Sequence, residues 1–185
     1  MELMVVVAMA SMLAAIGMPS FNAMIITNEL ADTSNDLTLS LKRARAEAIT
    51  SGRDVRVCSS LTTQSSDAGN AICSLAAGNW GKGWLILVDR NQDGNFKESD
   101  NELLWVKRID AGRGITINPV PPVGLTTNNF ESAVTFSYTG EIKKSANGGF
   151  QLCSGIEGGF PRREITVSVS GQTHFEKNTN SAVDC

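Results

Sequence analysis

Oxygen-bearing side chains recur at every second position in the stretch Asp89-x-Asn91-x-Asp93, and a glycine follows directly. Asp100 stands at the twelfth position counted from Asp89. This spacing fits the oxygen ligands and the turn glycine of an EF-hand-type calcium loop, in which the seventh residue, here Asn95, supplies its main-chain carbonyl. The stretch therefore suggests Ca²⁺ as a ligand, held by the side chains of Asp89, Asn91, Asp93 and Asp100.

The same stretch has a second interpretation. Asp100 is shorter than the bidentate Glu usual at the twelfth position, and the residues on both sides look like strands rather than helices. In polar hairpin loops, Asp and Asn side chains hydrogen-bond their own backbone, and Gly94 suits a positive φ angle there. Both interpretations stay open. Calcium is the one cofactor that the sequence suggests, and we expect that no cofactor is required.

Residues typical of catalysis are present but not grouped. Serine, aspartate and a single histidine, His174, occur without a spacing that places them together. The sequence has no nucleophile elbow, no phosphate-binding glycine loop and no histidine-rich metal motif. His174 is interpreted as a surface residue of a strand near the C-terminus. We therefore expect that the protein is not an enzyme.

One acidic residue marks the N-terminal stretch. Glu2 precedes the apolar run Leu3–Met18, and the next charge is Glu29. A secretory signal peptide would open with positive residues, whereas the first cation is Lys42. As a helix the run spans about 24 Å, less than a ~30 Å hydrocarbon core, so a membrane span needs Ile25-Ile26 or further apolar residues upstream. An unpaired carboxylate is costly there, and Glu2 is expected to have a partner.

Helical periodicity continues beyond Pro19. Apolar residues recur three, four or seven positions apart and predict a face that packs on a globular domain, at Ile26, Leu30, Leu37, Leu41, Ala44 and Ala48. The cations at 42–45 suit the C-terminal end of a helix, and Ser51-Gly52 is typical of its stop. We predict one helix from about residue 1 to about residue 51, kinked at Pro19.

Short β segments follow this helix. Alternation and turn residues predict strands at Asp54–Cys58, Trp84–Asp89, Leu103–Ile109, Gly114–Asn118, Ala133–Tyr138, Glu141–Lys143, Phe150–Cys153, Glu164–Ser168 and Thr173–Glu176. Hairpin turns are predicted at 140–141 and 170–172. The fold class is therefore α+β, a long kinked N-terminal helix packed on a globular domain of antiparallel β-sheets. The net charge of −3 argues against a strongly basic nucleic-acid surface.

The N-terminal residues resemble a known class of proteins. Glu2-Leu3-Met4-Val5-Val6-Val7-Ala8, Leu13-Ala14-Ala15-Ile16 and Pro19-Ser20-Phe21 are similar to the N-terminal helix of type IV pilins and type II secretion pseudopilins. The resemblance implies a helix stored in the inner membrane and later packed in a filament core. It implies that Glu2 pairs with the terminal amine of a neighbouring subunit and that Pro19 kinks the helix. Prepilin peptidase removes a leader in this class, and its processing site is expected to be absent from this chain.

The central residues resemble one branch of that class. Arg45–Ile49, Val55–Ser60, Trp80–Asp89 and Asp93-Gly94 are similar to FimT/FimU-type minor pilins and GspH-type pseudopilins. The resemblance implies a structural minor pilin that assembles into or primes a type IV pilus. Its partners would be other major and minor pilins, contacted through the N-terminal helix. The alternatives are a GspH-like minor pseudopilin of type II secretion and a FimT-like DNA receptor for natural transformation.

The DNA alternative depends on basic residues. DNA-binding FimT-like proteins resemble one another in a Gly-Arg-x-Arg element of the last hairpin, and the corresponding stretch here, Gly171-Gln172-Thr173-His174, lacks both arginines. The pairs Arg162-Arg163 and Lys143-Lys144 could substitute, but such pairs are usually solvated faces. DNA is a partner that the sequence permits and does not favour.

The resemblance also implies the domains and the compartment. Residues 1–26 would form the transmembrane and filament-core half of the helix, and residues 27–185 the periplasmic or surface-exposed pilin domain, with an amphipathic helix at 27–51 and a β region at 53–185. The protein would cross the inner membrane once and then enter a pilus or pseudopilus.

Four cysteines complete the inventory. In an oxidising periplasm two disulfides are expected, and the absence of a Cys-x-x-Cys pair argues against a zinc site. Three pairings are possible from sequence alone. We predict Cys58–Cys73, because it is the most local closure, and Cys153–Cys185, because it anchors the C-terminal tail.

Overall fold

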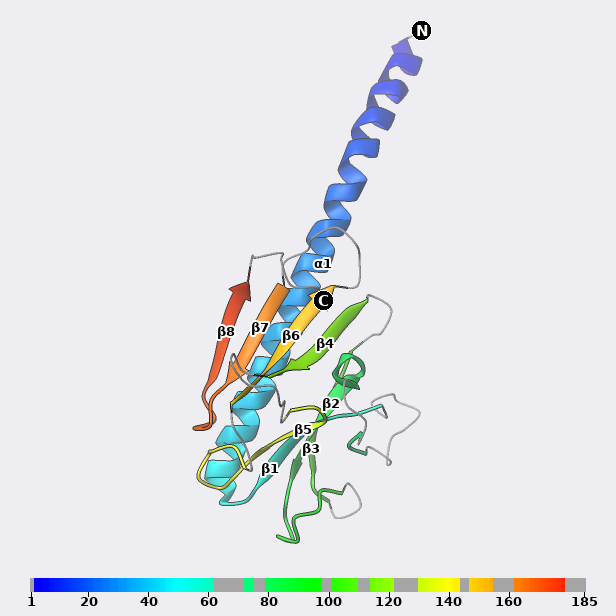
Figure 1. The fold of residues 1–185 in the computed structure, drawn as a ribbon. Coiled ribbons are helices and arrows are strands. Elements are labelled where there is room, and N and C mark those ends of the chain that lie inside the picture. Colours follow the sequence, from blue (N-terminus) through cyan, green and yellow to red (C-terminus); the bar gives the residue numbers. More distant parts are fainter. Residues whose placement is uncertain are drawn as a thin grey trace.

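The computed structural model describes residues 2–61, 72–74, 79–97, 101–109, 114–121, 130–143, 147–154 and 162–178. One long helix lies against two β-sheets (Figure 1). In chain order the elements are α1 (Glu2–Ser51), β1 (Val55–Ser59), the 3₁₀ helix η2 (Asn79–Lys82), β2 (Gly83–Val88), β3 (Leu103–Arg108), β4 (Ile115–Val120), β5 (Ala133–Phe136), β6 (Gly148–Ser154), β7 (Arg162–Val167) and β8 (Thr173–Asn178). The predicted α+β class is confirmed.

Helix α1 has two halves with different surroundings. Its N-terminal half projects away from the sheets, whereas its C-terminal half packs against them (Figure 1). The apolar face predicted for the second half is confirmed, because Leu30, Leu37 and Leu41 are fully buried, as are Ala44 and Ala48. The helix runs without a break through Pro19. A bend at that residue, as predicted, is consistent with a continuous helix. It ends at Ser51, where Gly52 adopts φ 65°, a left-handed residue typical of a helix end.

The strands form two four-stranded antiparallel sheets. The strand order is β3-β2-β1-β5 in the first sheet and β4-β6-β7-β8 in the second. The chain leaves the first sheet after β3, adds β4 to the second, and returns to the first with β5. Helix α1 contacts strands of both sheets, so its buried face joins them into one core.

One predicted strand is wrong. Glu141–Lys143 is not a strand, and only Ile142 forms an isolated bridge, to Phe136. The reason lies in the hydrogen bonds of the backbone. The N–H of Ile142 donates to the carbonyl oxygen of Val169 in the β7–β8 turn of the second sheet, whereas the N–H of Lys143 donates to that of Thr135 on β5 of the first sheet. Two successive residues bonded to different sheets cannot extend either ladder.

Aromatic residues fill the space between the helix and the sheets. Trp80 and Phe150 are fully buried, and their ring centroids lie 4.7 Å apart in an edge-to-face arrangement. The indole N–H of Trp80 donates to the carbonyl oxygens of Phe130 and Glu131. Trp84 on β2 donates from Nε1 to Ser40 Oγ on α1 at 2.9 Å. These bonds satisfy the indole N–H groups of both buried tryptophans, and the bond from Trp84 to Ser40 fixes the helix to the first sheet.

Candidate functional site

The N-terminal half of α1 presents an apolar surface to its surroundings. Leu3 is 77% exposed and Met4 81%, and further large apolar side chains are exposed at Val5, Val6, Val7, Met9, Met12, Phe21 and Met24. The side chains of Glu2 and Pro19, the two predicted assembly residues, lie outside the described part. Across the described residues, no helical stretch has both the length and the hydropathy of a membrane span. An apolar surface of this extent is typical of an interaction surface.

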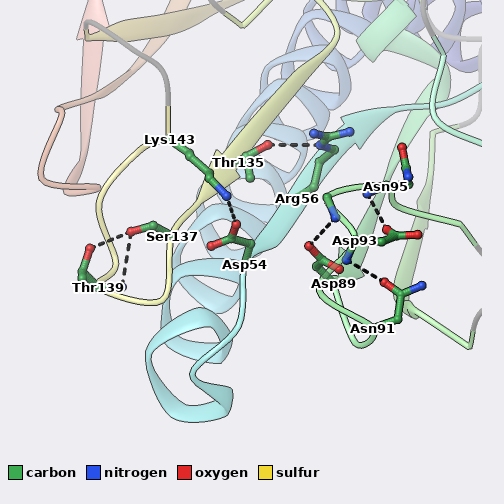
Figure 2. A network of polar contacts seen from close by, with 11 residues as sticks. Asp54, Arg56, Asp89, Asn91, Asp93, Asn95, Thr135, Ser137, Thr139 and Lys143 are labelled. Carbon is green, nitrogen blue, oxygen red and sulfur yellow. Dashed lines mark hydrogen bonds and ion pairs between the residues drawn. The ribbon is translucent and has the colours of Figure 1, made fainter.

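The predicted calcium residues share one loop between β2 and β3. Asn91 Oδ1 accepts a hydrogen bond from the N–H of Asp93 at 3.0 Å, and Asp93 Oδ1 accepts from the N–H of Asn95 at 2.7 Å. Asp89 is buried, and its Oδ2 accepts from the N–H of Gly94 at 3.0 Å (Figure 2). The self-bonded turn anticipated as one alternative is thus present, with Gly94 at φ 75°. Asp100 lies outside the described residues.

The exposed carboxylate of this loop is held in its charged form. The pKa of Asp93 is lowered below its ordinary value of 3.8, first by the hydrogen bond from the backbone N–H of Asn95 and further by the side chains of Asn95 and Asn91. The positive charge of Lys97 acts in the same direction. These contacts therefore favour the ionised form of Asp93 over the protonated form.

A buried glutamate that sequence reasoning missed also supports this loop. Glu102 is fully buried, and its Oε1 and Oε2 accept hydrogen bonds from the N–H groups of Arg90 and Lys97, each at 2.9 Å. One carboxylate thereby fastens both ends of the loop to the start of β3. The only signal in the sequence is an acidic residue directly before an apolar strand, which does not distinguish a buried carboxylate from a solvated one.

Arg56 on β1 lies beside this loop. Its Nε donates to Thr135 Oγ1 at 3.1 Å (Figure 2). Its Cζ lies 4.0 Å from the ring centroid of Phe96. Burial lowers the pKa of Arg56, while the charges of Asp89 and Asp54 oppose that shift. Sequence reasoning treated Arg56 only as a strand residue, because a single cation in a strand pattern gives no sign of burial.

The acidic residues near the loop do not form a dense cluster. In the portion of the chain that the structure describes, no group of three or more His, Cys, Asp or Glu side chains is arranged to hold a metal ion. Any metal in this loop would therefore need amide or main-chain oxygens besides Asp89 and Asp93.

The basic residues considered for DNA are engaged elsewhere. Lys143 forms an ion pair with Asp54, and the Cζ of Arg163 lies 5.3 Å from the ring centroid of Phe175. When the side-chain amide of Gln151 is oriented with its oxygen facing Arg162, that oxygen accepts a hydrogen bond from Arg162 Nη1 at 2.9 Å. Arg162 also forms an ion pair with Glu164, with Nη2 of Arg162 lying 3.7 Å from Oε2 of Glu164. Lys144 lies outside the described residues. Lys143, Arg162 and Arg163 therefore do not form one open basic surface.

A different basic cavity lies beside the last hairpin. It has a volume of about 420 Å³ and is lined by Lys42 and Arg45 of α1 and by Gln172 and His174 at the start of β8. Sequence reasoning missed it, because it combines residues more than a hundred positions apart. The predicted hairpin turn at 170–172 is confirmed, with Gly171 at φ 74° and its N–H donating to Ser168.

The cysteines agree with the predicted framework where they are described. Cys58 and Cys73 form a disulfide with their Cα atoms 5.5 Å apart, which confirms the first pairing. Cys153 is disulfide-bonded as well. Its predicted partner, Cys185, lies outside the described residues, so that pairing stays a prediction.

Comparisons with known proteins agree with this architecture. Residues 33–173 match the model of the family described as Type II transport protein GspH. The fold is similar to that of the type IV minor pilin FimU of Pseudomonas aeruginosa, with a TM-score of 0.57 and 18% identity over 84% of this chain and 92% of that one. It is also similar to the minor pseudopilin EpsH of the Vibrio cholerae type 2 secretion system, with a TM-score of 0.50 and 12% identity over 80% of this chain and 97% of that one. No curated protein matches the chain by sequence. Because the family match covers well over half of its length, the chain belongs to the GspH family of minor pilins and pseudopilins.

Proposed function

We propose that this chain is a structural minor pilin that assembles into or primes a type IV pilus. The observation that supports this role is the exposed apolar half of α1, which extends beyond the sheets and has no partner element among the described residues (Figure 1). In a filament this surface packs against the same helices of other major and minor pilin subunits. Before assembly it lies in the inner membrane, with the globular domain in the periplasm, after prepilin peptidase has processed the precursor.

Glu2 gives this proposal its sharpest test. Inside an apolar filament core its carboxylate requires a cationic partner, and the N-terminal amine of a neighbouring subunit supplies that charge. We expect Glu2→Ala to insert into the membrane normally but to be depleted from sheared pili in immunoblots. Asp32→Ala removes an exposed carboxylate of the same helix and serves as the control. Incorporation of the Glu2→Ala subunit at the wild-type level contradicts the proposed pairing.

The second candidate is a minor pseudopilin of type II secretion. The description of the matched family and the likeness to EpsH both support it. Deletion of the gene separates the two roles, because loss of surface pili with normal protein secretion supports the pilus role. Retained pili with an exoprotein trapped in the periplasm supports the secretion role.

A further inference from the structure

The loop after β2 contains a buried carboxylate oxygen without a partner. Asp89 is only 4% exposed, and its Oδ1 has no hydrogen-bond partner among the described residues. Its Oδ2 is bonded to the N–H of Gly94, five residues further along the same turn, so the carboxylate points across the loop. A buried anionic oxygen without a donor or a cation is costly, because it has lost its water without compensation. Oδ1 is therefore available as an oxygen ligand for a bound cation.

Two further oxygen-bearing side chains are held at the same turn. The hydrogen bonds to the N–H groups of Asp93 and Asn95 keep the Asn91 and Asp93 side chains close to the backbone of the loop. Figure 2 shows Asn91 and Asp93 on the loop that Asp89 points into.

Arg56, a cation that acts on Asp89, does not supply a hydrogen bond to Asp89 Oδ1. Arg56 acts on Asp89 through its charge, yet its Nε is bonded to Thr135 and its guanidinium stacks on Phe96. Arg56 therefore lowers the cost of the buried carboxylate without donating to Oδ1. Its positive charge and that of Lys97 repel a second cation, so any ion that binds here is held weakly.

We propose that this loop binds one Ca²⁺ ion through Asp89 Oδ1, the side chains of Asn91 and Asp93 and the main-chain carbonyl of Asn95, with water at the remaining positions. Mixed carboxylate, amide and carbonyl oxygens in an irregular loop suit Ca²⁺, whereas Mg²⁺ requires a stricter octahedron. With only two described carboxylates, the affinity falls in the range of extracellular modules, about 10⁻⁴–10⁻³ M. Calcium outside the cell reaches that range, so the ion would fasten the β2–β3 connection there.

The test uses the full-length chain, purified in detergent and stripped of metal with a chelator. We measure its thermal midpoint by circular dichroism in chelator, in 10 mM CaCl₂ and in 10 mM MgCl₂. A calcium concentration about tenfold above the dissociation constant should raise the thermal midpoint by about 3–5 °C. Magnesium should produce a clearly smaller shift.

Two variants and one control locate the effect. Asp93→Asn removes an exposed charge and keeps an acceptor for Asn95, and Asp89→Asn keeps the shape of the buried side chain. We expect each to reduce calcium affinity at least tenfold in calorimetric titrations. Glu141→Gln removes an exposed carboxylate in a distant turn and should leave the shift unchanged. The proposal is overturned if wild type shows no midpoint shift and no heat in calcium, if magnesium acts equally, or if Asp93→Asn responds as wild type does.

Discussion

Arg45 donates a 3.0 Å hydrogen bond from its Nε to the carbonyl oxygen of Gly140, and this bond joins α1 to the turn that follows β5. The same carbonyl oxygen faces the β7–β8 turn so closely that a Cβ atom at Gly171 would lie 2.1 Å from it. One peptide group in the turn after β5 therefore meets both the helix and the β7–β8 turn. Both Gly140 and Gly171 adopt a positive φ there, at 83° and 74°.

Gly171→Ala should be strongly destabilising. The new methyl group would overlap backbone at Gly140 and the side chain of Arg45, in addition to the strain of a positive φ. Gly52→Ala is the matched control, because Gly52 also has a positive φ (65°) but open space around it. In urea denaturation we expect Gly171→Ala to lose about 1–3 kcal/mol more than Gly52→Ala. Equal losses in the two variants would show that the contact between the turns adds nothing.

Removal of the Cys58–Cys73 disulfide should lower the free energy of unfolding by about 2–4 kcal/mol, because the bridge restricts the unfolded chain. The variant is Cys73→Ala, which keeps the buried Cys58 side chain in place. The double variant Cys58→Ala/Cys73→Ala adds the loss of packing against Leu85 and Leu87. Denaturation under oxidising conditions measures both. A Cys73→Ala protein as stable as wild type would mean that the bridge does not stabilise the domain.

Glu102→Gln should destabilise the β2–β3 connection by about 2–3 kcal/mol. The N–H groups of Arg90 and Lys97 now donate to the two carboxylate oxygens of Glu102. In Gln, the amide nitrogen would face one of these N–H groups without accepting from it, and the remaining hydrogen bond would go to a neutral oxygen. Exposed Glu131→Gln is the control and should change stability by less than about 0.5 kcal/mol. Amide hydrogen exchange at Arg90 and Lys97 should accelerate in the Glu102 variant. Unchanged exchange there would contradict the anchoring role.

The sequence patterns that proved reliable are local ones. The alternation after Arg162 places Ile165 and Val167 on the buried face of β7, and the helical spacing places Leu30 and Leu37 on the buried face of α1. In both cases the pattern records burial directly, because one face of each element meets the core. The residues 141–143 also looked like a strand, but their hydrogen bonds are divided between two sheets, and no local pattern records that division.

The site was harder to predict for the same reason. The loop residues Asp89, Asn91 and Asp93 stand close in sequence, so their pattern can be recognised without knowing the fold. Arg56 reaches the loop from β1 and Glu102 from the residue directly before β3, and their burial depends on how β1, β2 and β3 pair. The cavity between Lys42 and His174 arises only when the last hairpin packs on α1. Contacts across elements follow from the topology, which periodicity does not determine.

Acid should weaken the fold through Asp93. Its folded-state pKa lies below 3.8, so the contribution of this carboxylate to stability is present above 3.8 and is lost as the pH falls through the folded value. The stability difference between wild type and Asp93→Asn should therefore shrink as the pH drops below 3.8. Carbon-detected NMR titration of the Asp93 carboxyl gives the pKa directly. A midpoint at or above 3.8 would remove the basis for this prediction.

Duplex DNA should bind only weakly to this protein. The net charge is −3, and the described basic residues once considered for DNA are held by Asp54, by Glu164 and Gln151, and by the Phe175 ring. A phosphate backbone needs cations free to approach it, and its attraction falls steeply with salt. Mobility shifts with the full-length chain in detergent at ~150 mM salt should therefore give no complex at micromolar protein.

The variant Arg162→Ala/Arg163→Ala should not alter this result, and neither should Lys42→Ala in the cavity beside the last hairpin. If wild type instead forms a complex at or below micromolar protein, the two variants identify its site. Loss of that complex in the Arg162/Arg163 variant would mean that these side chains leave their contacts with Glu164 and Phe175 to meet phosphate. Loss in Lys42→Ala would place DNA between α1 and β8. Either loss would contradict the expected weak binding and would favour a role in DNA uptake over a purely structural one.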